Sequence, residues 1–356
     1  MSLYLSRIYI NMADIIERIR NNDPELKEAN LTGKNITDLS FIRYNTHLEK
    51  LKVDHNQISD ISDLRYNTSI KYLNISNNQI SDISVLQYNN TLEVLVISDN
   101  RISDISALRY NISLKKLYIA NNQISDISAL RYNNTLIQLW IHLNQISNIS
   151  VLAYNNTITR ISFSYNQISD ISALSQNSSL ITVSLLGNQI TDISALRNNN
   201  TISKLYLSHN QITDISALRY NSTIKKLCIT HNQISDISAL SYNNSILHLS
   251  LNNNRISDIN TLRDNSTITN LYLFNNLIVD INALRYNKSI KVLDIHNNLI
   301  TDVSALRYND TLIKFDLFGN QVSNDEITYI KGIVGLNVLN KPNRYATLFN
   351  LLIENL

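Results

Sequence analysis

The chain has 356 residues and carries 31 lysines and arginines against 29 aspartates and glutamates, which gives a formal charge of +2. So small a charge does not predict nucleic acid or an anionic membrane surface as the partner. Hydrophobic residues make up 44% of the sequence, yet no apolar run approaches the roughly 18 residues that a membrane-spanning helix requires. We therefore expect neither a nucleic acid nor a membrane among its partners.

The N-terminal segment and the cysteine content predict an intracellular protein. The first apolar stretch is interrupted by Ser6 and Arg7, and no small-residue cleavage site follows it, so it does not have the pattern of a secretory signal. Cys228 is the single cysteine, which excludes an intrachain disulfide and fits a reducing compartment. Asn-x-Ser/Thr triplets such as residues 67–69 recur through the chain, but we expect their asparagines to be buried, where glycosylation would conflict with folding.

The first element expected along the chain is a short helix. Residues 13–20 have apolar side chains at helical spacing, and Pro24 ends the pattern. A stack of repeats leaves an open edge at each end that must be covered. We therefore predict that residues 1–25 form an N-terminal helical cap. The alternative is an adaptor motif that docks a separate protein.

A 22-residue motif then repeats fourteen times without insertion or deletion over residues 26–333. In its first half Leu51 and Val53 alternate with polar residues, as in a strand, whereas residues 59–64 carry a capping residue and apolar residues spaced by three, as in a 3₁₀ or short helical turn. One strand and one turn cannot bury their own apolar face, but stacked copies can. The repeat therefore predicts an α/β solenoid, with a parallel sheet on its concave face and 3₁₀ or short helical turns on its convex face.

The pattern changes after Asn320, and the rest of the chain is predicted to cover the second open edge. We expect residues 334–356 to form a C-terminal helical cap, with a helix from about Tyr345 to Ile353. Its apolar residues Leu348, Leu351 and Leu352 suit packing against the last repeat.

The motif L-x-x-L-x-L-x-x-N-x-I, its 22-residue length and the run N-Q-I-S-D-I-S-A-L resemble the leucine-rich repeats of bacterial internalins. The composition is similar, more weakly, to repeat proteins of large DNA viruses that infect amoebae. The internalin resemblance implies a right-handed leucine-rich-repeat horseshoe or arc that binds protein ligands on its concave strands. The chain departs from that family at Asn67 and its equivalents, where the family usually carries leucine, so the packing of the convex side and the curvature do not carry over directly.

Two asparagine positions recur in the repeat. One runs from Asn56 at 22-residue intervals to Asn320, and the other includes Asn45, Asn67 and their equivalents just before each strand. An unpaired buried polar group costs about 1–3 kcal/mol, so an amide inside an apolar pattern must be hydrogen-bonded. We predict that both columns are structural ladders whose side chains bond the backbone of their own and the adjacent repeat.

Three further columns are expected to support the fold. The aspartates equivalent to Asp60 would repel one another if they only faced solvent, so we predict that they cap the N–H groups of the following turn. Arginines at 65, 109, 131 and 219 are expected to offset that charge. Tyrosines equivalent to Tyr66 form an outer stripe that we predict packs between repeats, rather than a docking surface.

Strand positions that point away from the core differ from copy to copy, and they carry the only tryptophan and six of the seven histidines. Exposed aromatic and amphipathic side chains in a row have the composition of protein-binding hot spots. Drift of duplicated repeats would also give variety, but it explains the aromatic enrichment less well. The predicted partner-binding residues are Tyr72, Tyr118, Trp140, His142, Arg160, Tyr165, Tyr206, His209, Tyr272, Phe274, His296 and Phe318.

Catalytic chemistry has little support in the sequence. Cys228 shares the strand face with His209, His231 and His248, and adjacent strands would place His209 and His231 about 5 Å apart, near enough to share a metal. No third catalytic residue, phosphate-binding glycine loop or zinc-type cysteine spacing accompanies them. We predict a non-enzymatic, monomeric scaffold that holds a protein partner without cofactor or metal. The alternatives are a carbohydrate-binding repeat protein and, third, an enzyme or metal site around Cys228.

Overall fold

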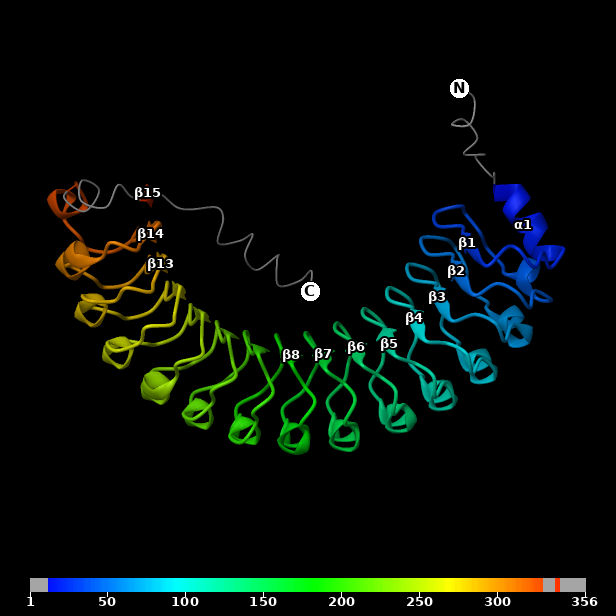
Figure 1. Ribbon diagram of the computed structural model, residues 1–356, viewed down its shortest axis with the longest axis horizontal. Coiled ribbons are helices and arrows are strands. Elements are labelled where there is room, and N and C mark those ends of the chain that lie inside the picture. The colour runs from blue at the N-terminus through cyan, green and yellow to red at the C-terminus, as the bar shows by residue number, and fades with distance from the viewer. Residues whose placement is uncertain (1–11, 329–336, 340–356) are drawn as a thin grey trace, which may run out of the picture. The chain divides into compact units, whose positions relative to one another are not determined.

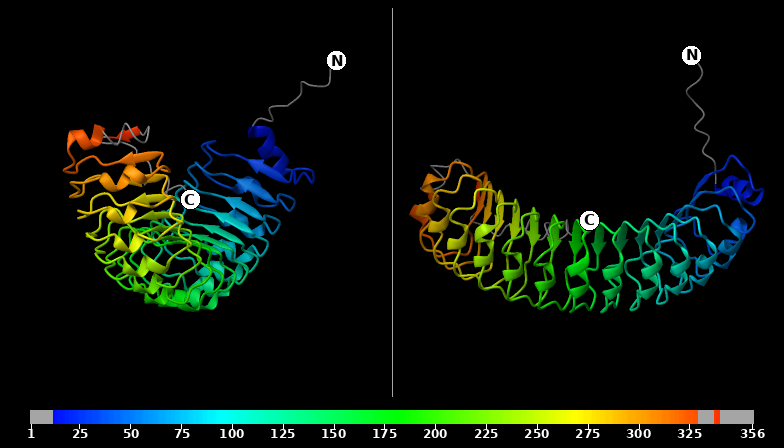
Figure 2. Two further views of the ribbon diagram at one scale, coloured as in Figure 1. Left: turned by 60° about the vertical axis from the view of Figure 1, so that its left-hand side comes forward. Right: turned by 60° about the horizontal axis from the view of Figure 1, so that its bottom comes forward.

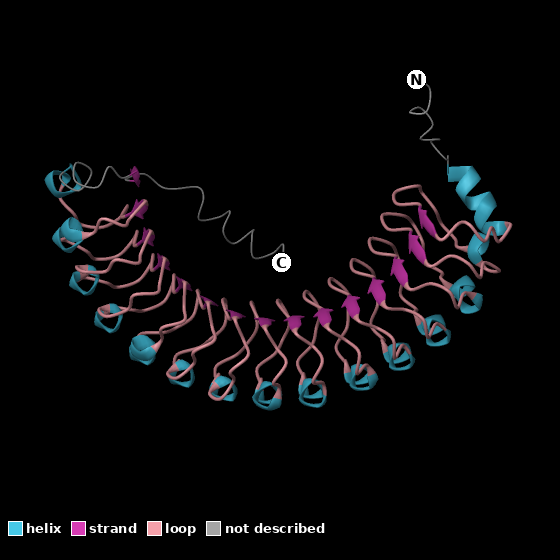
Figure 3. Ribbon diagram, viewed as in Figure 1, coloured by secondary structure: helices cyan, strands magenta, loops and turns pink. Residues whose placement is uncertain are grey.

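The computed structural model describes residues 12–328 and 337–339 (Figure 1). It divides into two compact units, residues 1–180 and 181–356. In each unit a fully described repeat forms one coil, in which a three-residue strand lies on one side and a 3₁₀ turn lies on the other (Figure 3). We call these two sides the strand face and the turn face. After the last of these coils, residues 324–328 are α-helical. The predicted alternation of short strands with 3₁₀ turns is confirmed.

The first unit contains one α-helix, seven strands and seven 3₁₀ turns among its described residues. They are α1 (Met12–Arg20), β1 (Glu28–Asn30), η1 (Ser40–Ile42), β2 (Lys50–Lys52), η2 (Ser62–Tyr66), β3 (Tyr72–Asn74), η3 (Ser84–Tyr88), β4 (Val94–Val96), η4 (Ser106–Tyr110), β5 (Lys116–Tyr118), η5 (Ser128–Tyr132), β6 (Gln138–Trp140), η6 (Ser150–Tyr154), β7 (Arg160–Ser162) and η7 (Ser172–Gln176).

The second unit continues with the same alternation (Figure 2). Its elements are β8 (Thr182–Ser184), η8 (Ser194–Leu196), β9 (Lys204–Tyr206), η9 (Ser216–Leu218), β10 (Lys226–Cys228), η10 (Ser238–Tyr242), β11 (His248–Ser250), η11 (Asn260–Leu262), β12 (Asn270–Tyr272), η12 (Asn282–Leu284), β13 (Val292–Asp294), η13 (Ser304–Tyr308), β14 (Lys314–Asp316) and β15 (Asn337–Leu339).

Neighbouring strands within each unit are parallel, and equivalent residues of successive repeats stand opposite one another. Tyr118 on β5 faces Trp140 on β6, and Lys204 on β9 faces Lys226 on β10. At the C-terminal end β14 pairs with β15, where Lys314 faces Asn337. This strand was not predicted from sequence, because it lies one residue out of phase with the 22-residue motif. The helix expected at 345–353 lies outside the described residues.

The helix expected at residues 13–20 is present as α1, next to η1. Ile19 of this helix is fully buried, and its carbonyl accepts a hydrogen bond from Asn45 Nδ2 at 3.0 Å. Asn45, the first residue of the second asparagine column, thus ties α1 to the first coils. No helix among the described residues combines the length and apolar character needed to cross a membrane.

The core of each coil is built from the leucine and isoleucine columns of the motif. In one coil of the first unit, Leu117, Ile119 and Ile124 are all 0% exposed. The middle residue of each strand points inward, since successive strand residues alternate between the two faces of the sheet. Complete burial of each such side chain contributes about 1.5–3 kcal/mol, and the contribution is repeated in every coil.

The first asparagine column forms the predicted ladder. Asn100 Nδ2 donates to Ile75 O of the preceding coil at 3.1 Å and to Ile97 O of its own coil at 3.2 Å, while Asn100 Oδ1 accepts from Ile80 N at 2.9 Å. One side chain therefore bonds backbone groups that no strand or turn would otherwise pair. This explains why asparagine recurs at a position surrounded by apolar residues.

The second column also bridges coils, and its burial is confirmed. Asn67 is 0% exposed and donates from Nδ2 to Asn45 O at 2.8 Å, and Asn67 Oδ1 accepts from Ile70 N at 3.1 Å. Two residues on, Ser69 Oγ donates to Leu48 O of the preceding coil at 2.7 Å. The recurring Asn-x-Ser/Thr triplets are therefore a hydrogen-bonding device of the fold.

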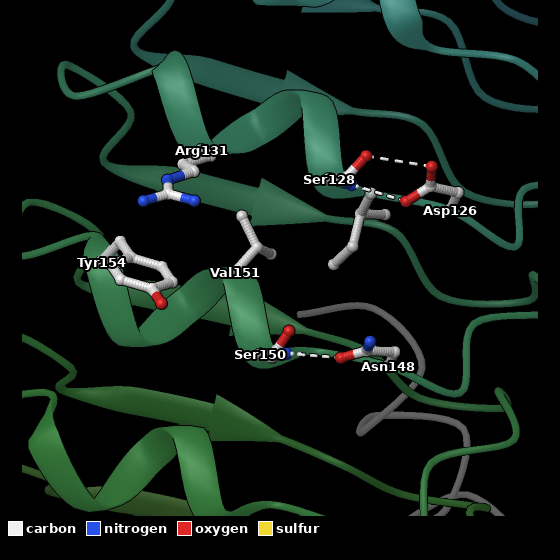
Figure 4. A pocket seen from close by; sticks show the side chains of 8 residues that line it. Asp126, Ser128, Arg131, Asn148, Ser150, Val151 and Tyr154 are labelled. Atoms are coloured by element: carbon white, nitrogen blue, oxygen red, sulfur yellow. Dashed lines mark hydrogen bonds between the residues drawn. The ribbon is translucent and has the colours of Figure 1, made fainter.

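The aspartate column caps the turns as predicted. At one equivalent pair, hydrogen bonds from Ser304 and the charge of Arg307 lower the pKa of Asp302, and the effect of Arg307 is in keeping with the expected role of the arginines. Asp126 Oδ1 accepts from Ser128 N at 2.8 Å at the start of η5 (Figure 4). The Arg131 guanidinium instead lies 4.2 Å from the centre of the Tyr154 ring in the next coil. Within the described part of the chain, the arginines at 65, 109, 131 and 219 form no salt bridge with this column. A guanidinium is attracted to the face of an aromatic ring, which explains this contact.

Candidate binding surfaces on the strand face

The structure distributes the predicted binding residues over two units. Tyr72, Tyr118, Trp140, His142, Arg160 and Tyr165 belong to the first unit, and Tyr206, His209, Tyr272, Phe274, His296 and Phe318 belong to the second. Within each unit, they lie on the strands or directly after them, because the first and last residue of each strand point away from the core. Each unit is therefore considered separately.

An aromatic pair lies on the strand face of the first unit. The rings of Tyr118 and Trp140 are edge-to-face, with centroids 4.7 Å apart and planes at 79°. Tyr118 Oη also donates to Gln138 Oε1 at 2.8 Å, which holds the phenol in place. Both aromatic side chains are half-buried. Sequence reasoning brought these two residues together correctly, since they are register partners on β5 and β6.

His142 follows Trp140 by two residues on the same face. It is half-buried, and its Nδ1 atom is buried without a hydrogen-bond partner. Burial lowers the pKa of the His142 imidazole below its ordinary value, so the ring is neutral at pH 7. Because the Nδ1 atom is buried, a ligand on the strand face would meet the other parts of the ring.

The coil after each strand makes a left-handed turn that sequence analysis missed. The residue at the eighth repeat position has positive φ: 51° at Asn121, 56° at Leu143, 53° at Tyr165 and 66° at Gly187. Glycine, asparagine, aspartate and histidine tolerate this conformation best. The sequence analysis treated this position only as variable, although its recurring Asn, Asp, Gly and His residues were the available signal.

Leu143 and Tyr165 are the bulky exceptions in this column of the first unit. They are 47% and 40% exposed, so burial does not compensate fully for a left-handed backbone that costs roughly 1–2 kcal/mol for an ordinary residue. Strain of this kind is often found at ligand-binding sites. We refer to Tyr118, Trp140, His142, Leu143 and Tyr165 as the aromatic cluster.

The other two predicted residues of the first unit lie outside the aromatic cluster's ring contacts. Tyr72 lies on β3 beneath two lysines, with Lys50 Nζ 5.7 Å and Lys52 Nζ 6.0 Å from its ring centre. Arg160 is exposed on β7, next to β6. They can extend a contact surface, but they do not form a packed group with the cluster.

The prediction that Tyr206 is an exposed binding residue is wrong. Its side chain is 1% exposed, and its Oη atom is buried without a hydrogen-bond partner. Burial raises the pKa of Tyr206 to about 12. Cys228 stands opposite Tyr206 on β10, and this small neighbour leaves space for the ring, over which Lys226 Nζ lies at 5.1 Å.

The group around Cys228 lacks the geometry of a catalytic or metal site. Cys228 is 2% exposed, and burial raises the pKa of its thiol to about 11, so the nucleophilic thiolate is scarce near neutral pH. His209 and His231 stack face to face, with centroids 3.9 Å apart and planes at 13°. Parallel rings direct their in-plane nitrogen lone pairs side by side, so the two do not converge on one ion.

A basic cleft lies beside this group on strands β9 to β12. Lys204 on β9, Lys226 on β10 and His248 on β11 are register partners, and Lys225 and Tyr272 also line the cleft. Like charges that stand directly opposite each other in a sheet destabilise it, so an anionic group placed here would be favourable. Sequence analysis selected Tyr272, which is half-buried, but not the lysines that surround the cleft.

The last strands of the second unit carry a ring stack and two acidic residues. Phe274 and His296 are parallel, with centroids 4.3 Å apart, and His296 Nδ1 lies 2.6 Å from Asp294 Oδ1. Asp316 is 3% exposed, and Phe318 is half-buried. Sequence analysis selected the aromatic residues of this group and His296 only as contacts for a partner.

One pocket lies on the turn face between η5 and η6 (Figure 4). It is lined by Asp126, Ser128, Arg131, Val151 and Tyr154, among others. Its polar groups are the Arg131 guanidinium, the Tyr154 hydroxyl, the capping pair of Asp126 with Ser128 and the equivalent pair in the next coil. The two capping pairs serve the fold, and the guanidinium of Arg131 lies over the ring of Tyr154.

Comparisons with known proteins agree with this architecture. The family model described as "Leucine Rich repeats (2 copies)" matches residues 68–110, 156–198 and 201–242, and the model described as "Leucine Rich repeat" matches residues 44–61 and 110–130. The comparison with curated proteins gives no match.

Solved structures are similar over most of the chain. An internalin from Listeria monocytogenes is 32% identical, with a TM-score of 0.79 over 84% of this chain and 88% of the other. A leucine-rich-repeat protein of Leptospira interrogans is 16% identical, with a TM-score of 0.78 over 94% of this chain and 100% of the other. A plant peptide hormone receptor in complex with RGF2 is 17% identical, with a TM-score of 0.72 over 91% of this chain and 60% of the receptor chain. The last two likenesses concern the fold alone.

Proposed function

Because this chain belongs to the leucine-rich-repeat family, together with the internalin of Listeria monocytogenes, we propose that it is a non-enzymatic scaffold that binds a protein or peptide on its strand face. The observation that carries this proposal is the aromatic cluster. It combines a fixed aromatic pair, a neutral half-buried histidine and two exposed apolar side chains on strained backbone.

These features suit a protein ligand in three ways. Aromatic side chains supply large contact area with little loss of conformational freedom, because few of their torsions are mobile. The Tyr118–Gln138 hydrogen bond orders the pair before a ligand arrives, which reduces the entropy cost of binding. The side chains of Leu143 and Tyr165, 47% and 40% exposed, add apolar contact area.

The basic cleft of the second unit supports the same function as a separate contact region. Its lysines favour an acidic side chain or the C-terminal carboxylate of the partner. The plant receptor of similar fold is recorded in complex with RGF2, which is in keeping with ligand binding by such an array. We also retain the proposals that the protein is intracellular and monomeric, that residues 1–25 and 334–356 cap the array, and that no cofactor takes part. The buried free thiol of Cys228 fits a reducing compartment.

The test is a quantitative pull-down that compares two matched triple variants. In the first, Tyr118, Trp140 and Tyr165 on the strand face are replaced by alanine. In the second, the exposed turn-face residues Tyr66, Tyr110 and Tyr132 are replaced. Each variant loses three aromatic side chains of one unit, so a general effect on folding would affect both.

We expect the strand-face variant to lose a partner that the turn-face variant retains. With the purified partner, a hot-spot aromatic residue should contribute at least about 2 kcal/mol, or roughly a thirtyfold change in Kd. If the strand-face variant retains every partner, the proposal is wrong. If the unaltered protein instead binds a glycan on an array, and the three strand-face substitutions abolish that binding, the protein is a carbohydrate-binding repeat protein and the proposal of a protein ligand is replaced.

A further inference from the structure

Three potential metal ligands converge at the C-terminal part of the second unit. Asp294 ends β13, Asp316 ends β14, and the two stand opposite each other in the parallel register. His296 follows Asp294 by two residues, so its side chain lies on the same face. One ligand atom from each residue lies within 4.8 Å of the other two.

The two carboxylates are unfavourable neighbours without a cation. Asp316 is 3% exposed, and its Oδ1 atom accepts one hydrogen bond, from Phe318 N at 3.1 Å. Its other oxygen has no hydrogen-bond donor among the described residues. Burial and the nearby Asp294 raise the pKa of the Asp316 carboxyl, as expected for a desolvated anion beside another anion.

His296 compensates for only part of this charge. Its Nδ1 atom lies 2.6 Å from Asp294 Oδ1, and although burial opposes protonation, this contact leaves the pKa of His296 above its ordinary value. One imidazolium against two carboxylates still leaves a net negative charge. Lys314 is the other nearby cation, and its exposed side chain is screened by solvent.

The histidine ring is also held in place. Phe274 of the preceding coil stacks on it, with planes at 13°, so Nδ1 stays directed toward the acidic residues. The repeat itself does not require this arrangement, because the preceding coil has Tyr272 and Phe274 at the positions equivalent to Asp294 and His296.

We propose that Asp294, His296 and Asp316 bind a divalent transition-metal ion, zinc in the first place. One imidazole nitrogen and two carboxylate oxygens suit zinc, whereas calcium requires six to eight oxygens. Binding at Nδ1 replaces the hydrogen bond between His296 and Asp294, and a neutral ring then carries its proton on Nε2. Since the side chains of Asp294 and His296 are each 16% exposed, a coordination position remains accessible from the strand face.

The experiment is isothermal titration of the chelator-treated and untagged chain with zinc chloride. We expect one ion per chain with a micromolar or lower Kd. Asp316→Asn keeps the side-chain shape but removes one negative ligand, and it should weaken binding at least about tenfold. Because no partner is used, failure here is independent of the proposed scaffold function.

Two control variants identify the site. Asp54 and His55 form another acidic–histidine contact, with Asp54 Oδ2 and His55 Nδ1 3.0 Å apart, but belong to no group of three convergent ligands among the described residues. His55→Ala should therefore leave zinc binding unchanged, and His231→Ala should do so too. Three results would overturn the proposal. They are zinc binding that Asp316→Asn does not weaken, zinc binding that is lost in either control variant, and no zinc binding by the unaltered chain. Circular dichroism of each variant confirms that the fold is retained.

Discussion

Replacing Asn155 by leucine should destabilise the first unit far more than the same replacement of Asn133, although the two residues occupy the same position in adjacent coils. Leucine has the branched shape of asparagine, so the gain in apolar burial is similar at both sites. Asn155 Oδ1 accepts hydrogen bonds from Thr157 N and Ile158 N, each at 2.9 Å. Asn133 Oδ1 is buried without a partner.

The difference follows from the backbone. In the coil of Asn133, a turn precedes the strand, and in this turn Leu136 N donates to the backbone oxygen of Asn133 at 3.2 Å. The side-chain oxygen of Asn133 therefore pairs with no N–H group of this turn. At Asn155 the side chain is the acceptor for Ile158 N, and Ile158 is 2% exposed. Leaving that N–H unpaired costs about 1–3 kcal/mol, and losing the bond from the exposed Thr157 adds about 0.5–1.5 kcal/mol.

Asn133→Leu removes two bonds from Nδ2, to Leu108 O and Asn111 O. Both carbonyls keep a second donor, Asn111 N and Leu114 N respectively, and the substitution also removes the orphaned oxygen. These effects nearly cancel. We expect Asn155→Leu to lower the free energy of unfolding by about 2–3 kcal/mol more than Asn133→Leu.

Urea denaturation of both variants measures this difference, and native-state hydrogen exchange at Ile158 locates it. Exchange is needed because a repeat array can unfold in parts. Equal destabilisation, or a larger effect at Asn133, would refute the argument that a buried amide stabilises this fold only through the groups it pairs.

Three other predictions concern single residues. Leu143→Asn should raise the free energy of unfolding by about 1 kcal/mol in thermal denaturation, because φ is 56° there, and an unchanged or lower Tm would contradict the strain argument. The thiol of native Cys228, with a pKa of about 11 against 9.0 ordinarily, should react with iodoacetamide at pH 8 about a hundredfold more slowly than the thiol of the unfolded chain. The rate should rise with pH as the thiolate forms. Equal rates in the two states would show that the thiol is not buried. Asp126→Ala should lower the free energy of unfolding in urea by about 1 kcal/mol. Asp126→Asn should lower it little, because Asn148 makes the equivalent bond, in which its Oδ1 accepts from Ser150 N at 2.8 Å. Similar losses in the two variants would mean that the charge of Asp126, rather than its capping hydrogen bond, matters.

The pKa shifts of the buried groups set an alkaline limit to stability. Burial raises the pKa values of Cys228 and Tyr206 to about 11 and about 12, so folding favours their protonated forms. Their contribution is complete below the unfolded pKa values and is lost as pH rises through the folded ones.

The repeat and its hydrogen-bonding columns could be predicted because they depend on local pattern repeated many times. Strand alternation at Leu51 and Val53, the buried amide of Asn67 and the capping carboxylate of Asp126 all follow from a residue's own coil and its identical neighbour. When every neighbour is a copy, the surroundings of a residue can be read from the sequence itself.

Only the tertiary structure decided the burial and the contacts of side chains whose neighbours in the adjacent coils are different residues. Tyr206 is buried because the residue opposite is the small Cys228, and Arg131 stacks on Tyr154 instead of pairing with aspartate. Asp294 and Asp316 become a possible metal site only when the register of β13 and β14 places them together with His296. On the strand face, lateral packing between unlike residues sets burial and charge, and that packing is a property of pairs of coils which a single repeat does not contain.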